Sequence, residues 1–349
     1  MSCRIAVVGA GKMGKLHARV ISEMPDVELA CVVDVDEGRA KTVAKQRSCP
    51  WFTNPAEALA LADAAIIAVP TMHHVSAARD FIQAGKAVLI EKPLAIDVQA
   101  GRELIDLAEK NNTTVQVGHT ERFNPAVLAM EKYDIRAKFI ESHRISPFTF
   151  RSADVGVVMD MMIHDIDLVL MLARSAVKSV HAVGINVIGK HEDVCNARIL
   201  FENGCVANVT ASRLAIKTER KMRIFSEEAY ISVDYGQKVG LAVKRSENLD
   251  LIQMARQLDV DDLADLAENI EYSKLLNVEQ LEIDESIEPL KQQAEAFSKT
   301  VTEGRAPVVS AEDGLAAVQT AQMITDSIAE HKWDGDASDR AGLDIISAE

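Results

Sequence analysis

Two residues in the middle of the chain have types and spacing suited to acid/base chemistry. Asp160 and His164 stand four positions apart in the string DMMIHDID, so on a helix their side chains share one face. A carboxylate orients a neighbouring imidazole, and histidine titrates near neutral pH. We predict an acid/base pair that takes the proton of a hydroxyl group during its oxidation. The alternatives are a structural hydrogen bond between the two and a metal site completed by Asp167, for which the sequence offers no further ligand cluster.

A lysine stands at the end of an apolar run in the first third of the chain. Lys92 lies in the tripeptide Glu91-Lys92-Pro93, directly after AVLI. If this run is a strand of a parallel sheet, Lys92 lies at the carboxyl edge, where doubly wound folds bind their ligands. The alternative is a strand-end lysine whose amine reaches solvent.

A glycine turn near the N-terminus predicts a dinucleotide site. Residues 9–14 read GAGKMG, a GxGxxG pattern that follows an apolar strand and opens a helix. The first glycine permits the tight turn, the second lets the backbone approach a pyrophosphate, and the third allows close packing of helix on strand. The predicted site comprises Gly9, Gly11, Lys12, Met13 and Gly14.

The second predicted strand ends in an acid that bears on the choice of nucleotide. Asp34 lies twenty residues past Gly14 and has no arginine directly after it. A carboxylate there accepts hydrogen bonds from both ribose hydroxyls of the adenosine half and repels a 2′-phosphate. The sequence therefore predicts NAD as the cofactor, in preference to NADP.

These residues require a sheet whose strands end at one edge. Short apolar runs alternate with helical patterns as far as about residue 119, which predicts an α/β, doubly wound parallel sheet covered on both faces. The expected strands are 4–8, 27–34, 64–70, 87–93 and 113–119. The expected helices are 12–24, 37–46, 55–61, 73–84 and 97–110.

The pattern changes after about residue 123. Longer, alternating runs at 139–145, 179–187, 196–201 and 205–213 predict a mostly antiparallel open sheet in an α+β domain, with a helix at about 156–173. We expect a Rossmann domain at 1–122 and a substrate-binding and oligomerisation domain at 123–349. The acidic segment 247–287 reads as an insertion or arm, and a last helix at about 310–331, capped by Ser310, is expected to pack back near the first domain.

The composition excludes several classes of protein. A formal net charge of −15 opposes binding to nucleic acid, and no apolar run is long enough to span a membrane. The N-terminus lacks the features of a signal peptide, so we expect a cytoplasmic protein. Five cysteines without CxxC spacing argue against disulfides and against a cysteine-bound metal, and we predict no metal site.

Taken in order, several motifs resemble one enzyme family. The chain is similar to the glucose-fructose oxidoreductase / inositol dehydrogenase / MocA family in five places. In chain order these are VVGAGKMGKLHARVI, Pro70-Thr71 with His74, Glu91-Lys92-Pro93, VGHTERFNPA and the Asp160/His164/Asp167 pattern. The match spans roughly residues 3 to 213 and returns at PVVSAEDGLAAVQTAQMI. The combination is specific, whereas no single motif is.

The resemblance implies a role for each matching residue. Lys92 would contact the reacting hydroxyl and lower its pKa, His164 would be the general base, and Asp160 would support the pair and the nicotinamide ribose. The cofactor would also be bordered by Pro70, Thr71 and His74, with Glu91 at the nicotinamide end. Where the family often begins its second motif with Gly-Gly, this chain reads VGVVMDMM, so contacts near the substrate are expected to differ.

The resemblance extends to a substrate class. VQVGHTERFNPAV is similar to members that act as UDP-N-acetylglucosamine 3-dehydrogenases, which implies oxidation at C3 of that nucleotide sugar. Candidates for holding the substrate are Arg122, Asn124, Arg144 and Arg151. The alternatives are a dehydrogenase of a free sugar, an inositol or a small non-sugar compound, and a non-catalytic NAD-binding regulator. A homodimer or homotetramer is expected, because an open sheet face is a natural subunit interface.

Overall fold

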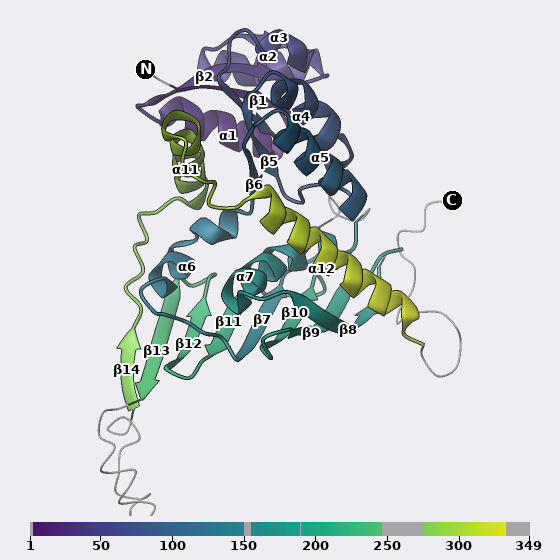
Figure 1. Cartoon of the computed structure of the whole chain (residues 1–349), viewed down its shortest axis with the longest axis vertical. Helices are drawn as coiled ribbons and strands as arrows, with labels where there is room; N and C mark the ends of the chain where they lie inside the picture. The colour runs from purple at the N-terminus through teal and green to yellow at the C-terminus, as the bar shows by residue number, and fades with distance from the viewer. Residues whose placement is uncertain (1–2, 150–154, 189, 246–275, 333–349) are drawn as a thin grey trace, which may run out of the picture.

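The computed structural model describes residues 3–149, 155–188, 190–245 and 276–332, which form two separate sheets and the helices that pack on them (Figure 1). No helix in these ranges is both long and apolar enough to cross a bilayer. Arg151 and most of the predicted arm at 247–287 lie outside the described residues, as does the tail after residue 332.

The first sheet has six strands in the order β3-β2-β1-β4-β5-β6, and every neighbouring pair is parallel. This confirms the predicted doubly wound sheet. Because β1 lies between β2 and β4, the strand order reverses beside the glycine turn that follows β1, where such folds bind nucleotides. The strands are β1 Cys3–Val8, β2 Val27–Val33, β3 Trp51–Phe52, β4 Ala64–Ile67, β5 Ala87–Glu91 and β6 Val115–Gly118.

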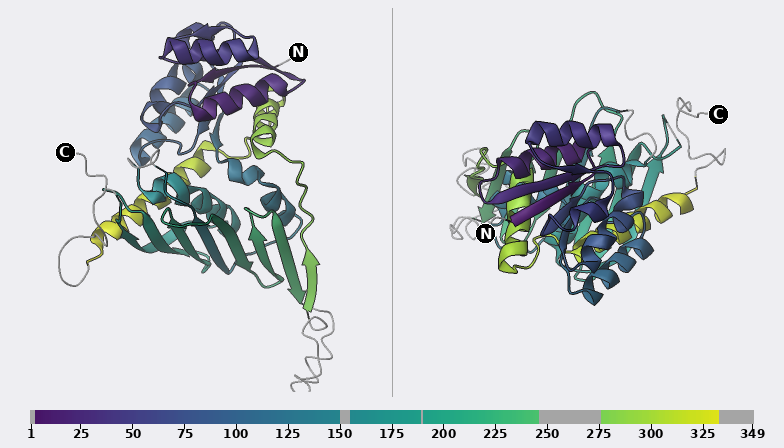
Figure 2. Two further views of the ribbon diagram at one scale, coloured as in Figure 1. Left: turned by 180° about the vertical axis from the view of Figure 1, so that it is seen from behind. Right: turned by 90° about the horizontal axis from the view of Figure 1, so that it is seen from above.

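Helices cover both faces of this sheet, and one of them comes from far along the chain. The local helices are α1 Lys12–Glu23, α2 Glu37–Arg47, α3 Pro55–Ala58, α4 His74–Gln83 and α5 Val98–Lys110. Helix α11, Pro289–Glu303, packs beside α1 (Figure 2), and its Phe297 is buried in one core with Ile5 of β1. The sequence did not predict α11, and a division of domains at residue 122 stays a prediction.

The second sheet has eight strands in the order β14-β13-β12-β11-β7-β10-β9-β8. Only the β7/β10 pair is parallel, which confirms the predicted, mostly antiparallel sheet. The strands are β7 Phe139–Ile145, β8 Val177–Ile185, β9 Val194–Phe201, β10 Val206–Ser212, β11 Glu219–Phe225, β12 Ala229–Asp234, β13 Val239–Arg245 and β14 Leu276–Gln280. Strand β14 falls within the predicted arm at 247–287 and corrects that prediction for its five residues.

Helices lie on one face of the second sheet and connect it to the first. The predicted helix at 156–173 begins as a π-helical turn, η4 (Val158–Met162), and continues as α7 (Ile163–Ala173). Helix α12, Ala311–Glu330, contacts α7 and β8 and also reaches α5 and β6 of the first layer (Figure 1). Ser310 caps α12 through a capping box with Asp313, as its sequence predicts.

Candidate active site

The glycine turn has the geometry that its pattern predicts. Gly9 has φ +101°, and a Cβ there would lie 2.5 Å from the carbonyl oxygen of Ala68. A Cβ on Gly14 would lie 1.7 Å from the carbonyl oxygen of Gly9. In contrast, a Cβ on Gly11 would meet no atom within 4 Å. The open space at Gly11, at the N-terminus of α1, fits the diphosphate of a dinucleotide.

We predict that alanine substitutions at Gly11 and Gly14 have different effects on NAD binding and on stability. Gly11→Ala should weaken NAD binding with little change in melting temperature, because its methyl group occupies only the space left for the cofactor. Gly14→Ala should lower the melting temperature as well, because helix α1 must move away from β1. Thermal unfolding and calorimetric titration with NAD check both variants. Equal melting temperatures for the two would contradict this assignment.

Asp34 follows β2 and lies beside the glycine turn. Its Oδ2 accepts a hydrogen bond from the Ala10 amide at 2.6 Å, and its Oδ1 accepts one from the Asp36 amide at 2.9 Å. These bonds orient the carboxylate and leave lone pairs on both oxygens. Lys12 is exposed and Met13 is half-buried in the first turn of α1. The arrangement suits an adenosine ribose held at the end of β2.

The loops after β4 and β5 are joined through His74. His74 is buried, with Nδ1 2.9 Å from the carbonyl oxygen of Pro93 and Nε2 3.1 Å from that of Val69. Burial lowers its pKa. Its ring nitrogens therefore contact main chain on both sides, so His74 positions the loop that carries Pro70 and Thr71.

Glu91 forms a buried pair that the sequence did not reveal. Its Oε1 lies 2.7 Å from Nε2 of His17, a fully buried residue of α1. The pair links the helix of the glycine turn to the strand that ends at Lys92. The motif KLHARV contains His17, but nothing in its local spacing indicates a partner 74 positions away.

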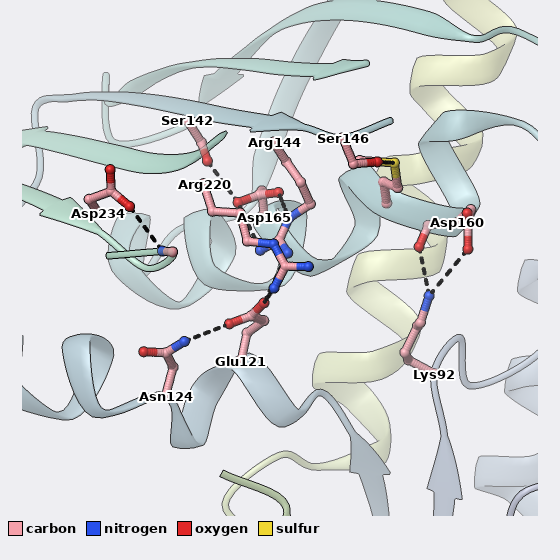
Figure 3. A network of polar contacts seen from close by, with 12 residues as sticks. Lys92, Glu121, Asn124, Ser142, Arg144, Ser146, Asp160, Asp165, Arg220 and Asp234 are labelled. Carbon is pink, nitrogen blue, oxygen red and sulfur yellow. Dashed lines mark hydrogen bonds and ion pairs between the residues drawn. The ribbon is translucent and has the colours of Figure 1, made fainter. Parts of the chain in front are cut away.

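Lys92 lies where the end of β5 faces the second sheet and its helices. Its Nζ donates a hydrogen bond to the main-chain carbonyl of Asp160 at 2.7 Å, and the Oδ1 atom of Asp160 lies 4.0 Å away (Figure 3). The predicted cleft lysine and the predicted acid are thus brought together. Among the described residues, the ion pair of Asp160 is with Lys92, whereas its spacing had suggested His164 as the partner.

His164, in the first turn of α7, is uncharged near neutral pH. Its Nδ1 is buried and has no hydrogen-bond partner among the described residues. Burial lowers the pKa of His164 well below 6.5, and the charges of Lys92 and Arg144 lower it further. A neutral imidazole beside a lysine ammonium is able to accept a proton.

His119 is a further buried imidazole next to these residues. Gly118 pairs with Glu91 in the parallel register, so His119 and Lys92 are the first residues after two adjacent strands. Both ring nitrogens of His119 lack a hydrogen-bond partner in the described part of the chain. Burial lowers its pKa, although nearby Asp167 acts in the opposite direction. The string VGHTERF contains His119, but its position beside Lys92 follows only from the sheet order.

Arg122 and Asp167 form a buried, bidentate ion pair. Nε and Nη2 of Arg122 each lie 2.7 Å from an oxygen of Asp167. The pair joins the turn after β6 (η2, Thr120–Phe123) to α7. Both carboxylate oxygens of Asp167 therefore accept hydrogen bonds from Arg122. Among the described residues, no group of three potential metal-binding side chains is found. A substrate contact by Arg122 stays a prediction.

Arg144 and Asn124 belong to a second polar network (Figure 3). Arg144 Nε donates to Asp165 at 2.5 Å and its Nη1 donates to Glu121 at 2.9 Å. Asn124 donates to the other oxygen of Glu121 at 3.0 Å and caps helix α6, Pro125–Met130. Burial opposes ionisation of Glu121, but Arg144 brings its pKa below the ordinary value. Contacts of Arg144 and Asn124 with a substrate stay predictions, and the sequence did not single out Glu121 or Asp165.

Comparison with known proteins identifies the family of both parts of the chain. Residues 3–119 match the oxidoreductase family with an NAD-binding Rossmann fold, and residues 133–232 match the GFO/IDH/MocA C-terminal domain. The UDP-N-acetylglucosamine 3-dehydrogenase of Acidithiobacillus ferrooxidans is 36% identical over 233 residues, or 66% of this chain and 74% of that protein. The inositol 2-dehydrogenase of Rhizobium meliloti is 25% identical over 342 residues, or 95% and 98%.

A solved structure extends the likeness over nearly the whole chain. UDP-N-acetylglucosamine 3-dehydrogenase GnnA from Acidithiobacillus ferrooxidans superposes with a TM-score of 0.82 at 28% identity, covering 94% of this chain and 98% of that one. The chain therefore belongs to the GFO/IDH/MocA oxidoreductase family, and its residues 3–119 form that family's NAD-binding Rossmann fold.

Proposed function

We propose that this protein oxidises a ring hydroxyl of a sugar derivative, the C3 hydroxyl of UDP-N-acetylglucosamine, to the ketone. The observation that carries the proposal is Lys92 at the carboxyl edge of a nucleotide-binding sheet, bonded to the turn of η4 that leads directly into His164 of α7. The 36% identical UDP-N-acetylglucosamine 3-dehydrogenase supports the choice of substrate. Bound NAD supplies the hydride acceptor, at C4 of its nicotinamide ring.

The side chains divide the proton chemistry between them. The Lys92 Nζ donates a hydrogen bond to the reacting hydroxyl oxygen and stabilises negative charge on it. His164 takes the hydroxyl proton at Nε2, because its Nδ1 is buried. The carbon loses a hydride as its hydroxyl loses a proton, so the two electrons and the proton are all accounted for. Asp160 holds Lys92 in place through its main-chain carbonyl.

A panel of substrates tests the proposal. The purified protein is mixed with NAD and UDP-N-acetylglucosamine, other UDP-sugars, free sugars or inositols, and absorbance of the reduced nicotinamide is followed. Turnover with UDP-N-acetylglucosamine supports the proposal. Turnover with only an inositol would replace it by the activity named for the Rhizobium meliloti relative. Tight NAD binding without turnover of any compound would favour a regulatory protein.

We also propose that the protein is a homo-oligomer joined through the open face of the second sheet. Apolar residues that are directly opposite each other on neighbouring strands form a row across this face from β14 to β9. Within this row the ring centroids of Phe225 and Phe139 are 5.6 Å apart. The row consists of Val278, Val243, Tyr230, Phe225, Phe139, Val206 and Leu200. Phe225→Lys is expected to shift the sedimentation coefficient to that of a monomer. A wild-type protein that already sediments as a monomer would contradict this proposal.

A further inference from the structure

Arg220 lies on the site-facing side of the second sheet. In the register of β7 and β11 it is directly opposite Arg144, so both side chains belong to the same face. Figure 3 shows the two guanidinium groups next to each other above Glu121, with Lys92 and Asp160 apart from them on the right. Arg220 therefore adds a second arginine to the region that Arg144 occupies.

The two arginines differ in how their donors are used. Arg144 is buried and donates hydrogen bonds to Asp165 and Glu121. Arg220 Nη1 lies 3.8 Å from Glu121 Oε1, beyond hydrogen-bond distance, and the side chain is 46% exposed. Within the described residues, this is its one ion pair. An arginine carries five N–H donors in a rigid fork, so Arg220 is available to a second anion.

The charge of Arg220 also reaches the reacting centre. It contributes to the lowering of the His164 pKa, after burial and the charges of Lys92, Arg144 and His119. Helix α7, which carries His164, packs on the face of the sheet that holds both arginines, since its Asp165 accepts a hydrogen bond from Arg144 and Arg144 lies opposite Arg220. In a nucleotide sugar oxidised at C3, the diphosphate is attached at C1, and only C2 separates the two carbons.

We propose that Arg220 binds phosphoryl oxygens of a nucleotide-sugar diphosphate. The inference rests on the proposed function, because it places the reacting sugar at His164. Guanidinium and phosphate groups match as bidentate, charge-assisted partners. Glu121, which already accepts from Arg144, holds the Arg220 guanidinium at the edge of the site without using its donors.

The test measures binding of UDP, which carries the diphosphate but lacks the N-acetylglucosamine ring that is proposed to be oxidised. Calorimetric titration compares the wild-type protein with Arg220→Gln and with Arg223→Gln, all saturated with NAD. Arg223 lies on the same strand but on the opposite face, where it pairs with Glu141 at 3.6 Å, so its replacement controls for the loss of one charge. We expect Arg220→Gln to weaken UDP binding roughly ten- to a hundredfold. Arg223→Gln should bind like the wild type.

The outcomes separate this inference from the proposed function. Equal UDP affinity in the wild type and Arg220→Gln overturns the inference, even if UDP-N-acetylglucosamine is oxidised. An equal loss in Arg220→Gln and Arg223→Gln also overturns it, since net charge would then explain the effect. A selective loss in Arg220→Gln without any turnover of UDP-N-acetylglucosamine supports the diphosphate site and rejects the proposed reaction. Melting temperatures and elution volumes confirm that both variants are folded and assembled.

Discussion

Replacing His164 by asparagine is expected to lower kcat by roughly two to four orders of magnitude, with NAD affinity unchanged. Asparagine approximates the polar end of the imidazole but cannot take up a proton at neutral pH. His164 lies in α7, whereas the glycine turn and Asp34 lie beside α1 and β2, so the nucleotide contacts should be preserved. Steady-state kinetics and NAD titration measure the two effects separately.

The pH profile gives this prediction a second measurement. Because burial and the Lys92 charge lower the pKa of His164 well below 6.5, the neutral form persists to mildly acidic pH. The acidic limb of the kcat/KM profile should therefore lie below pH 6.5. In Lys92→Met the limb of the residual activity should move to higher pH, because the charge that lowers the pKa of His164 is removed. A wild-type limb at or above pH 6.5, or a profile unchanged in His164→Asn, would remove His164 from the role of base.

Asp167→Ala is expected to reduce the free energy of unfolding by about 3–5 kcal/mol. The substitution leaves the Arg122 guanidinium buried without its bidentate partner, since Arg122 is 9% exposed and Asp167 is fully buried. Asp313, 3.9 Å from Arg122, is too distant to replace both hydrogen bonds. Urea unfolding, followed by tryptophan fluorescence and by circular dichroism, measures the loss.

A double substitution is the matched control. Arg122→Met with Asp167→Leu removes both charges and fills similar volume, so it should recover much of the stability lost in Asp167→Ala. If the double variant were no more stable than the single one, the cost would come from packing and not from an unpaired charge. Its KM for the sugar substrate also tests whether Arg122 contacts that substrate.

Much of the site is encoded in short segments of sequence. The turn at Gly9, Gly11 and Gly14 depends on steric limits within one β-α unit, so its conformation follows from residue type and spacing. Lys92 is placed at the sheet edge by the apolar strand before it. The alternation of strand and helix likewise determines a parallel first sheet, and the longer alternating runs determine an antiparallel second one.

Contacts between distant segments required the folded chain. The local spacing predicted an interaction of Asp160 with His164. In the folded chain the end of β5 lies against η4, so Asp160 interacts with Lys92. Sheet order places His119 beside Lys92, since β5 and β6 are neighbours. Similarly, α11 packs in the core of the first sheet although it lies near the other end of the chain. Its amphipathic pattern predicts a buried face but not the element that covers it.

The sequence by itself thus determined the family, the two kinds of sheet, the nucleotide turn and the positions of Lys92 and His164 in the chain. Tertiary structure decided which charges are neutralised: Asp167 by Arg122, and Asp165 by Arg144, with Arg220 left to a weaker contact. The physical reason is that steric preferences act between near neighbours in sequence. Ion pairs and burial depend instead on which surfaces meet when the sheets and helices pack.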